Sequence, residues 1–123
     1  MDTQQIAERM REMNMAGENE SIYQQLYSPD AESIEMPGGA NSEFEHCRGL
    51  GEIAKKGEWW MNNFTIHSIE VSEPLVADDW FALRYTMDAE DKNNGERHSM
   101  SELGVYQVRD GKVVREQFFY TVG

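Results

Sequence analysis

The stretch RHSMSELGVYQVRDGKVVREQFFY, residues 97–120, decides the fold class of this chain. Apolar and polar residues alternate on both sides of Asp110-Gly111, a dipeptide that favours a tight turn between two β-strands. Residues 79–89 alternate in the same way, and Asn94-Gly95 predicts a two-residue hairpin turn before residue 97. Strands joined by turns this short pair antiparallel. The second half of the chain therefore predicts an antiparallel sheet.

The first half of the chain has the apolar spacing of helices. Ile6, Met10 and Met13 recur at intervals of four and three, which places them on one helical stripe. Three helices are predicted, over residues 4–15, 20–27 and 51–62. Two further strands are predicted. One covers residues 31–36 and follows a break at Ser28-Pro29-Asp30. The other covers residues 64–76 and is interrupted near Pro74.

This order predicts one α+β domain spanning residues 1–123, in which three helices pack on one face of a curved antiparallel sheet. A chain of 123 residues with 39% hydrophobic residues can bury a core without disulfides or metal. The single cysteine, Cys47, has no internal partner, and the N-terminus lacks the apolar segment of a signal peptide. A cytoplasmic location is expected.

The net charge of −12 argues against two classes of partner. A chain this acidic repels phosphate backbones and anionic lipid surfaces. No apolar run approaches the roughly 20 residues that span a bilayer. Neither nucleic acid nor membrane is therefore expected as a partner.

Several motifs, in order along the chain, resemble the SnoaL-like branch of the nuclear transport factor 2 superfamily, to which ketosteroid isomerases and polyketide cyclases are related. Met15-Ala16-Gly17 with residues 26–31, LYSPDA, looks like the family's "NAGD…LFADDA". Residues 49–53, GLGEI, look like its "G…AI" start of the third helix. Residues 106–114, YQVRDGKVV, look like its "FRFRDGKIV" hairpin.

The resemblance implies a cone-shaped fold whose concave side holds a ligand, lined by the first strand and the last two strands. It also shows where this chain departs from known activities. Met36 precedes Pro37 where ketosteroid isomerases carry a catalytic aspartate, and Glu35 is expected on the opposite face. Phe118 stands where the cyclases carry an aspartate.

Strand alternation then predicts which side chains enter the cone. Glu102, Tyr106 and Tyr120 are the predicted catalytic residues. The predicted ligand-binding residues are Met36, Trp60, Tyr85, Met87, Met100, Glu116 and Phe118.

Glu102 is the candidate acid or base, because a carboxyl among apolar side chains has a raised pKa. The alternatives are a simple ion pair with a strand neighbour such as Arg84, or a carboxylate exposed at the rim of the cone. Glu116 either pairs with Glu102 or forms a salt bridge with Arg97 or Arg115, the latter being favoured. Tyr106 and Tyr120 either donate hydrogen bonds to a ligand oxygen or pack in the core.

These residues predict a pocket for a small, mostly apolar organic molecule, and a cofactor-free isomerase, cyclase or lyase acting on its carbonyl or hydroxyl group. A non-catalytic binding or dimeric interaction domain is the alternative. His46-Cys47 lacks metal-ligand spacing, so neither a metal nor a cofactor is expected. Leu103, Val105, Val113 and Phe119 are expected on the outer face as an apolar patch, which predicts a homodimer.

Overall fold

The three helices form within two residues of their predicted bounds. In the computed structural model, which describes residues 1–39 and 41–122, α1 spans Thr3–Met15, α2 spans Asn19–Leu26 and α3 spans Gly49–Asn63. The Asp2 side chain accepts a hydrogen bond from the Gln5 backbone N–H at 2.8 Å, and the Gln5 side chain accepts one from the Asp2 N–H. This capping box satisfies two N–H groups that the first turn leaves unpaired.

Seven strands form one sheet. They are β1 (Tyr27–Ile34), β2 (His46–Arg48), β3 (Phe64–Val71), β4 (Leu75–Ala77), β5 (Trp80–Asp91), β6 (Arg97–Arg109) and β7 (Lys112–Phe119), with a short 3₁₀ helix at Ser42–Phe44. Their order across the sheet is β2-β1-β7-β6-β5-β3, and β4 also pairs with β5. The break predicted near Pro74 is present between β3 and β4.

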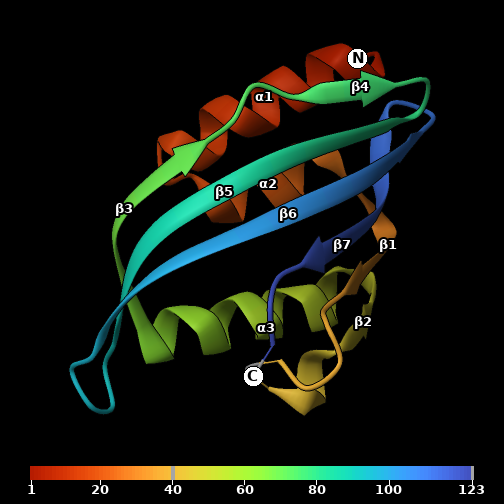
Figure 1. Ribbon diagram of the computed structural model, residues 1–123. Coiled ribbons are helices and arrows are strands. Elements are labelled where there is room, and N and C mark those ends of the chain that lie inside the picture. Colours follow the sequence, from red (N-terminus) through yellow and green to blue (C-terminus); the bar gives the residue numbers. More distant parts are fainter. Residues whose placement is uncertain (40, 123) are drawn as a thin grey trace.

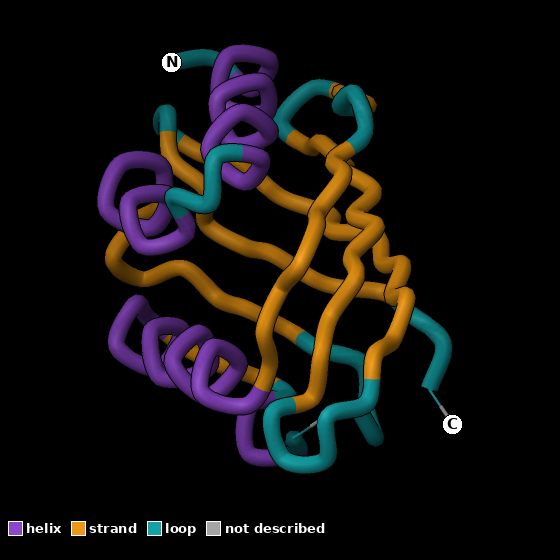
Figure 2. Tube along the Cα trace, turned by 90° about the vertical axis from the view of Figure 1, so that its left-hand side faces the viewer, coloured by secondary structure: helices purple, strands orange, loops and turns teal. Residues whose placement is uncertain are grey.

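The helices and the sheet form two layers. In Figure 1, α2 lies behind the long strands β5 and β6, α1 lies above them behind β3 and β4, and α3 runs below them. Figure 2 shows all three helices on the same side of the curved sheet. The predicted α+β class is confirmed, and one pairing adds to the antiparallel arrangement: β1 runs parallel to β7, so the sheet is mixed. Within the described part of the chain, no helix is long and apolar enough to cross a membrane.

The first strand begins earlier than predicted. Tyr27 is the first residue of β1 instead of the last of α2, and Ser28-Pro29-Asp30 lies within the strand instead of breaking the chain before it. The pairing of β1 with β7 shifts register between Tyr27 and Glu32. Because proline has no N–H for the ladder, Pro29 is tolerated at this irregularity.

A second irregularity, at the start of β7, changes which residues of that strand point inward. The register of β6 with β7 shifts after Gln107, so Val113, opposite Val108, is fully buried. The prediction that Val113 lies on the outer face is therefore wrong. Leu103 and Phe119 do lie on that face, opposite each other in the ladder and 48% and 40% exposed.

Both predicted hairpins form. Asp110 and Gly111 have φ values of 51° and 74°, the left-handed conformations that a tight turn between β6 and β7 requires. The connection between β5 and β6 is longer than the predicted two-residue turn: it covers residues 92–96, and Gly95 adopts a φ of 74° within it.

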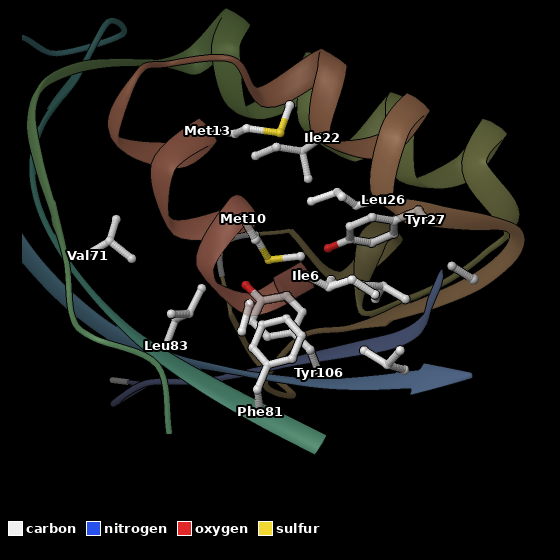
Figure 3. Packing of buried hydrophobic residues seen from close by; sticks show 14 of the residues in the cluster. Ile6, Met10, Met13, Ile22, Leu26, Tyr27, Val71, Phe81, Leu83 and Tyr106 are labelled. Atoms are coloured by element: carbon white, nitrogen blue, oxygen red, sulfur yellow. The ribbon is translucent and has the colours of Figure 1, made fainter. Parts of the chain in front are cut away.

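The core lies between the sheet and the first two helices. Figure 3 shows Ile6 and Met10 of α1 close to the rings of Phe81 and Tyr106. These two rings stack with their centroids 4.7 Å apart. Gly104 makes room for this packing, since a Cβ at that position would lie 2.6 Å from the Tyr106 hydroxyl and 2.9 Å from its ring.

The contact at Gly104 predicts a stability difference between two glycine substitutions. Gly104→Ala should lower the free energy of unfolding by about 1–3 kcal/mol, because the new Cβ would displace the buried Tyr106 ring from its stack on Phe81. Gly51→Ala on α3 meets nothing within 4 Å and should raise it by about 0.5–1 kcal/mol. Urea unfolding measures both, and equal effects of the two substitutions would show that Gly104 is not a packing requirement.

Candidate active site

A cavity of about 1250 Å³ lies on the helix-covered side of the sheet, with walls from all three helices and from β3, β5, β6 and β7. Most of the side chains predicted to face inward line it. They are Trp60, Tyr85, Met87, Met100, Glu102, Tyr106, Glu116, Phe118 and Tyr120. The structure therefore brings together nine of the ten residues selected from the sequence.

Met36 is the exception. It lines a shallow groove with Arg84, Leu103 and Phe119 instead of the main cavity. Ala31 and Ser33 are fully buried, so the inward positions of this segment are the odd-numbered ones, and Glu35 lines the cavity. The expectation that Met36 points inward and Glu35 outward is wrong by one residue.

Glu102 lies opposite Tyr85 in the β5–β6 ladder, and both side chains line the cavity. Burial, together with the negative charges of Glu35 and Glu116, raises the pKa of Glu102 to about 7, although Lys56 opposes the shift. The Arg84 alternative is not supported, because Arg84 is opposite Leu103 and exposed. A carboxyl with this pKa can take up and release protons near neutral pH.

Glu116 is almost completely buried, at 2% exposure. The Tyr27 hydroxyl donates to its Oε2 at 2.7 Å, whereas its Oε1 has no hydrogen-bond partner within the described residues. Burial raises the pKa of Glu116, and Lys56, Tyr27 and Ser33 only partly offset that effect.

The favoured expectation of a salt bridge from Glu116 to Arg97 or Arg115 is wrong. Arg97 pairs with Asp88 at 2.5 Å, and Arg115 lies 3.7 Å from Glu32. Both arginines are therefore paired with other carboxylates, and neither forms a salt bridge with Glu116 within the described residues.

Lys56 and Glu35 form an ion pair that sequence reasoning missed. Lys56 Nζ donates to Glu35 Oε2 at 2.9 Å and also to the Ser33 hydroxyl, and it lies 5.3 Å from the centre of the Phe118 ring. Counting the alternation of β1 from Ala31 instead of from Met36 would have located Glu35. The spacing of α3 also carried a signal for Lys56, because it lies three residues after Ile53 and four before Trp60, on one helical stripe, whereas Lys55 is exposed.

The tyrosines occupy two separate hydrogen-bonded groups. Tyr106 and Tyr85 join through their hydroxyls at 2.5 Å, and the Asn14 side chain donates to Tyr85 Oη at 3.2 Å. Tyr120 instead donates to Glu35 Oε1 at 2.9 Å. Burial raises the pKa of Tyr85, Tyr106 and Tyr120, so all three hydroxyls keep their protons at neutral pH.

Four half-buried rings form one side of the cavity, which we call the aromatic wall: Phe44, Trp59, Trp60 and Phe64. Trp60 stacks on Phe64 with centroids 4.3 Å apart, and Trp59 contacts Phe64 at 6.1 Å and Phe44 at 6.3 Å. Both tryptophans line the cavity, so Trp59 joins Trp60, which was among the predicted ligand-binding residues.

The comparisons with known proteins agree with this architecture. The model of the SnoaL-like domain family matches residues 1–120. The chain therefore belongs to the SnoaL-like family. The resemblance stated from the sequence motifs is confirmed, while no curated protein matches the chain.

Solved structures of other SnoaL-like and related proteins share the fold. A candidate SnoaL-like polyketide cyclase from Mesorhizobium loti, also labelled a carbohydrate phosphatase, is 32% identical, with a TM-score of 0.89 over 98% of this chain and 100% of its own. A protein of unknown function with a cystatin-like fold from Xanthomonas campestris is 19% identical, with a TM-score of 0.79 over 98% and 92%.

A third is a hypothetical protein with a ketosteroid isomerase-like fold from Catenulispora acidiphila, crystallised in complex with trimethylamine. It is 12% identical, with a TM-score of 0.74 over 94% of this chain and 85% of its own. At this identity the likeness shows the fold alone.

The raised pKa of Glu102 predicts how stability depends on pH. The folded state holds a proton on Glu102 up to about pH 7, whereas the unfolded state loses it near 4.5, so stability should fall as pH rises through this window. In Glu102→Gln, the decrease in the free energy of unfolding between pH 5 and pH 8 should be smaller by up to about 3 kcal/mol.

Urea unfolding at the two pH values measures this decrease. Glu70→Gln removes an exposed charge and is the control. If the free energy of unfolding depends on pH equally in both variants, the expectation is contradicted.

Proposed function

We propose that the cavity binds a small, mostly apolar organic molecule and that Glu102 transfers a proton to or from it, beside a carbonyl or hydroxyl group. The observation that carries this proposal is the Glu102 carboxyl, whose pKa is raised to about 7 and which shares the cavity with the hydroxyl pair Tyr85–Tyr106. The reaction class is isomerisation, cyclisation or elimination without a cofactor.

The mechanism assigns different tasks to the two groups. Ionised Glu102 removes a proton from a carbon next to the carbonyl, and electron density moves to the carbonyl oxygen. Asn14 donates to Tyr85, so Tyr85 can donate to Tyr106 and leave the Tyr106 proton free for the developing oxyanion. Protonated Glu102 then returns the proton to another atom of the substrate.

Tyr120 has a different task in this proposal. Its proton is already donated to Glu35, which in turn holds Lys56. Tyr120 is therefore a positioning residue for the Glu35–Lys56 pair, and the predicted direct contact with substrate falls to Tyr106 instead.

Exchange of α-protons in D₂O, followed by NMR on ring ketones such as 2-indanone, tests the proposal. The exchange rate should rise with pH up to about 7 and then level off, because only ionised Glu102 acts as a base. Glu102→Gln should lower it at least about 100-fold, whereas Glu70→Gln should not change it.

If Glu102→Gln exchanges protons at the wild-type rate while ketones still raise the melting temperature, the cavity is a binding site without acid–base chemistry. The enzymatic part of the proposal would then be wrong. That outcome would favour the alternative of a non-catalytic ligand-binding domain.

We also propose that a second copy of the chain covers the outer face of the sheet. Leu103 and Phe119 are opposite each other in the ladder, half exposed, and border the groove that contains Met36. Removing such apolar area from water favours association.

Sedimentation equilibrium tests this second proposal. The wild-type chain should have twice its mass of 14.2 kDa, and Leu103→Glu should shift it toward the single-chain mass. Asn94→Glu, in the loop of residues 92–96, adds the same charge away from this face and should leave the dimer intact. A wild-type protein of single-chain mass would contradict the proposal.

A further inference from the structure

The cavity contains more carboxyl groups than cations that could neutralise them. Glu35, Glu102 and Glu116 line it together with Lys56. Two other groups on the lining that can carry positive charge are engaged elsewhere: Lys92 donates to the Met61 carbonyl at 2.9 Å, and His67 pairs with Glu90 at 2.8 Å. Lys56 is therefore the cation within reach of the three carboxyls.

Lys56 is already committed to one of these carboxyls. It pairs with Glu35 at 2.9 Å and donates a second hydrogen bond to Ser33. Across residues 1–39 and 41–122, neither Glu102 nor Glu116 has a basic group within salt-bridge distance. Burying a carboxyl without such a partner is costly, and folded proteins avoid it unless something compensates.

Glu116 also presents an unused oxygen. Its Oε2 accepts from Tyr27, but its Oε1 is buried without a hydrogen-bond partner in the described residues, on a side chain that lines the cavity. Buried acceptors of this kind are rare, because each one loses its hydrogen bonds to water and gains none within the protein. An N–H donor brought by a ligand would satisfy it.

The aromatic wall supplies the second element of such a site. Trp59, Trp60, Phe44 and Phe64 line the same cavity as Glu116. The faces of such rings attract cations as well as apolar groups, and tryptophan does so most strongly. The carboxyls that lack basic partners and the electron-rich rings therefore both favour a ligand that carries a positive charge.

We infer that the ligand carries a protonated amine, which donates to Glu116 Oε1 and is attracted by Glu102, while its apolar part packs against the aromatic wall. This inference rests on the proposed function, since it requires that the cavity hold a small molecule. It narrows the ligand class from neutral carbonyl and hydroxyl compounds to those that also bear a basic nitrogen.

Binding of a cation has a measurable consequence for protons. Without ligand, burial raises the pKa of Glu102 to about 7, so Glu102 holds a proton for part of the time at pH 7, and burial raises the pKa of Glu116 as well. A bound cation favours the ionised carboxylates and so releases protons. The two carboxyls act on each other, and the other titratable groups that interact with them are Tyr23, Tyr27, Glu35, Cys47, Lys56, Tyr85, Tyr106 and Tyr120.

The experiment compares two probes of equal shape, 4-phenylbutylamine and 4-phenylbutanol, by isothermal titration calorimetry with the full chain. The amine should bind at least about tenfold more tightly than the alcohol at pH 7. Titrations in two buffers of different ionisation enthalpy should show proton release with the amine and none with the alcohol.

Variants assign the effect to the two carboxyls. Glu116→Gln, which keeps an acceptor for Tyr27, should weaken amine binding about tenfold and leave alcohol binding within about twofold. Glu102→Gln should reduce proton release. Glu70→Gln removes an exposed charge and should change neither measurement.

Equal affinity for the two probes, preference for the alcohol, or failure of the amine to bind would overturn the inference. Amine binding that Glu116→Gln does not weaken would overturn it as well. If the alcohol binds and α-proton exchange still depends on Glu102, the proposed function stands although the amine inference fails. The two failures are therefore distinguishable.

Discussion

The buried carboxyl of Glu116 is the constraint around which the cavity is arranged. It lies on β7, with Tyr106 of β6 opposite it on one side and Ser33 of β1 on the other. Tyr27 donates to it from the start of β1, and Lys56 of α3 lowers the cost of its charge. These neighbours come from β1, β6 and α3, so the buried carboxyl of β7 is satisfied only when three strands and one helix are in place together.

Much of this arrangement follows from two-residue alternation in the long hairpin strands. β5 and β6 pair without a shift from Trp80 to Glu90, so counting every second residue finds Tyr85, Met87, Glu102 and Tyr106 correctly. The same counting fails where the pairing is irregular. β1 ends at Ile34, so counting back from Pro37 starts outside the strand, and a shift at the start of β7 moves Val113 inward. Lys56 lies three residues after Ile53 and four before Trp60, on one helical stripe, but a lysine on such a stripe is ordinarily interpreted as exposed.

This chain has the fold of its family, but its acidic residues stand at positions other than those that the resemblance associates with isomerases and cyclases. The fold is retained in relatives as distant as 12% identity, while Met36 and Phe118 replace the aspartates that the sequence resemblance associates with isomerases and cyclases. Acidic groups are nevertheless present in the cavity, displaced by one or two positions: Glu35 beside Met36, and Glu116 two residues before Phe118. An acid moved along a strand by an even number of residues stays on the same face, so the fold can relocate such a group without rebuilding its frame.

The position of β7 has a consequence for how the protein is made. This strand joins β1 to β6 in the middle of the sheet, yet it is the last strand to be synthesised. Until residue 119 has left the ribosome, β1 has no strand through which to join β6, although α1 can already pack on β5. The sheet therefore closes in one late step, after the helices and the β5–β6 hairpin are available.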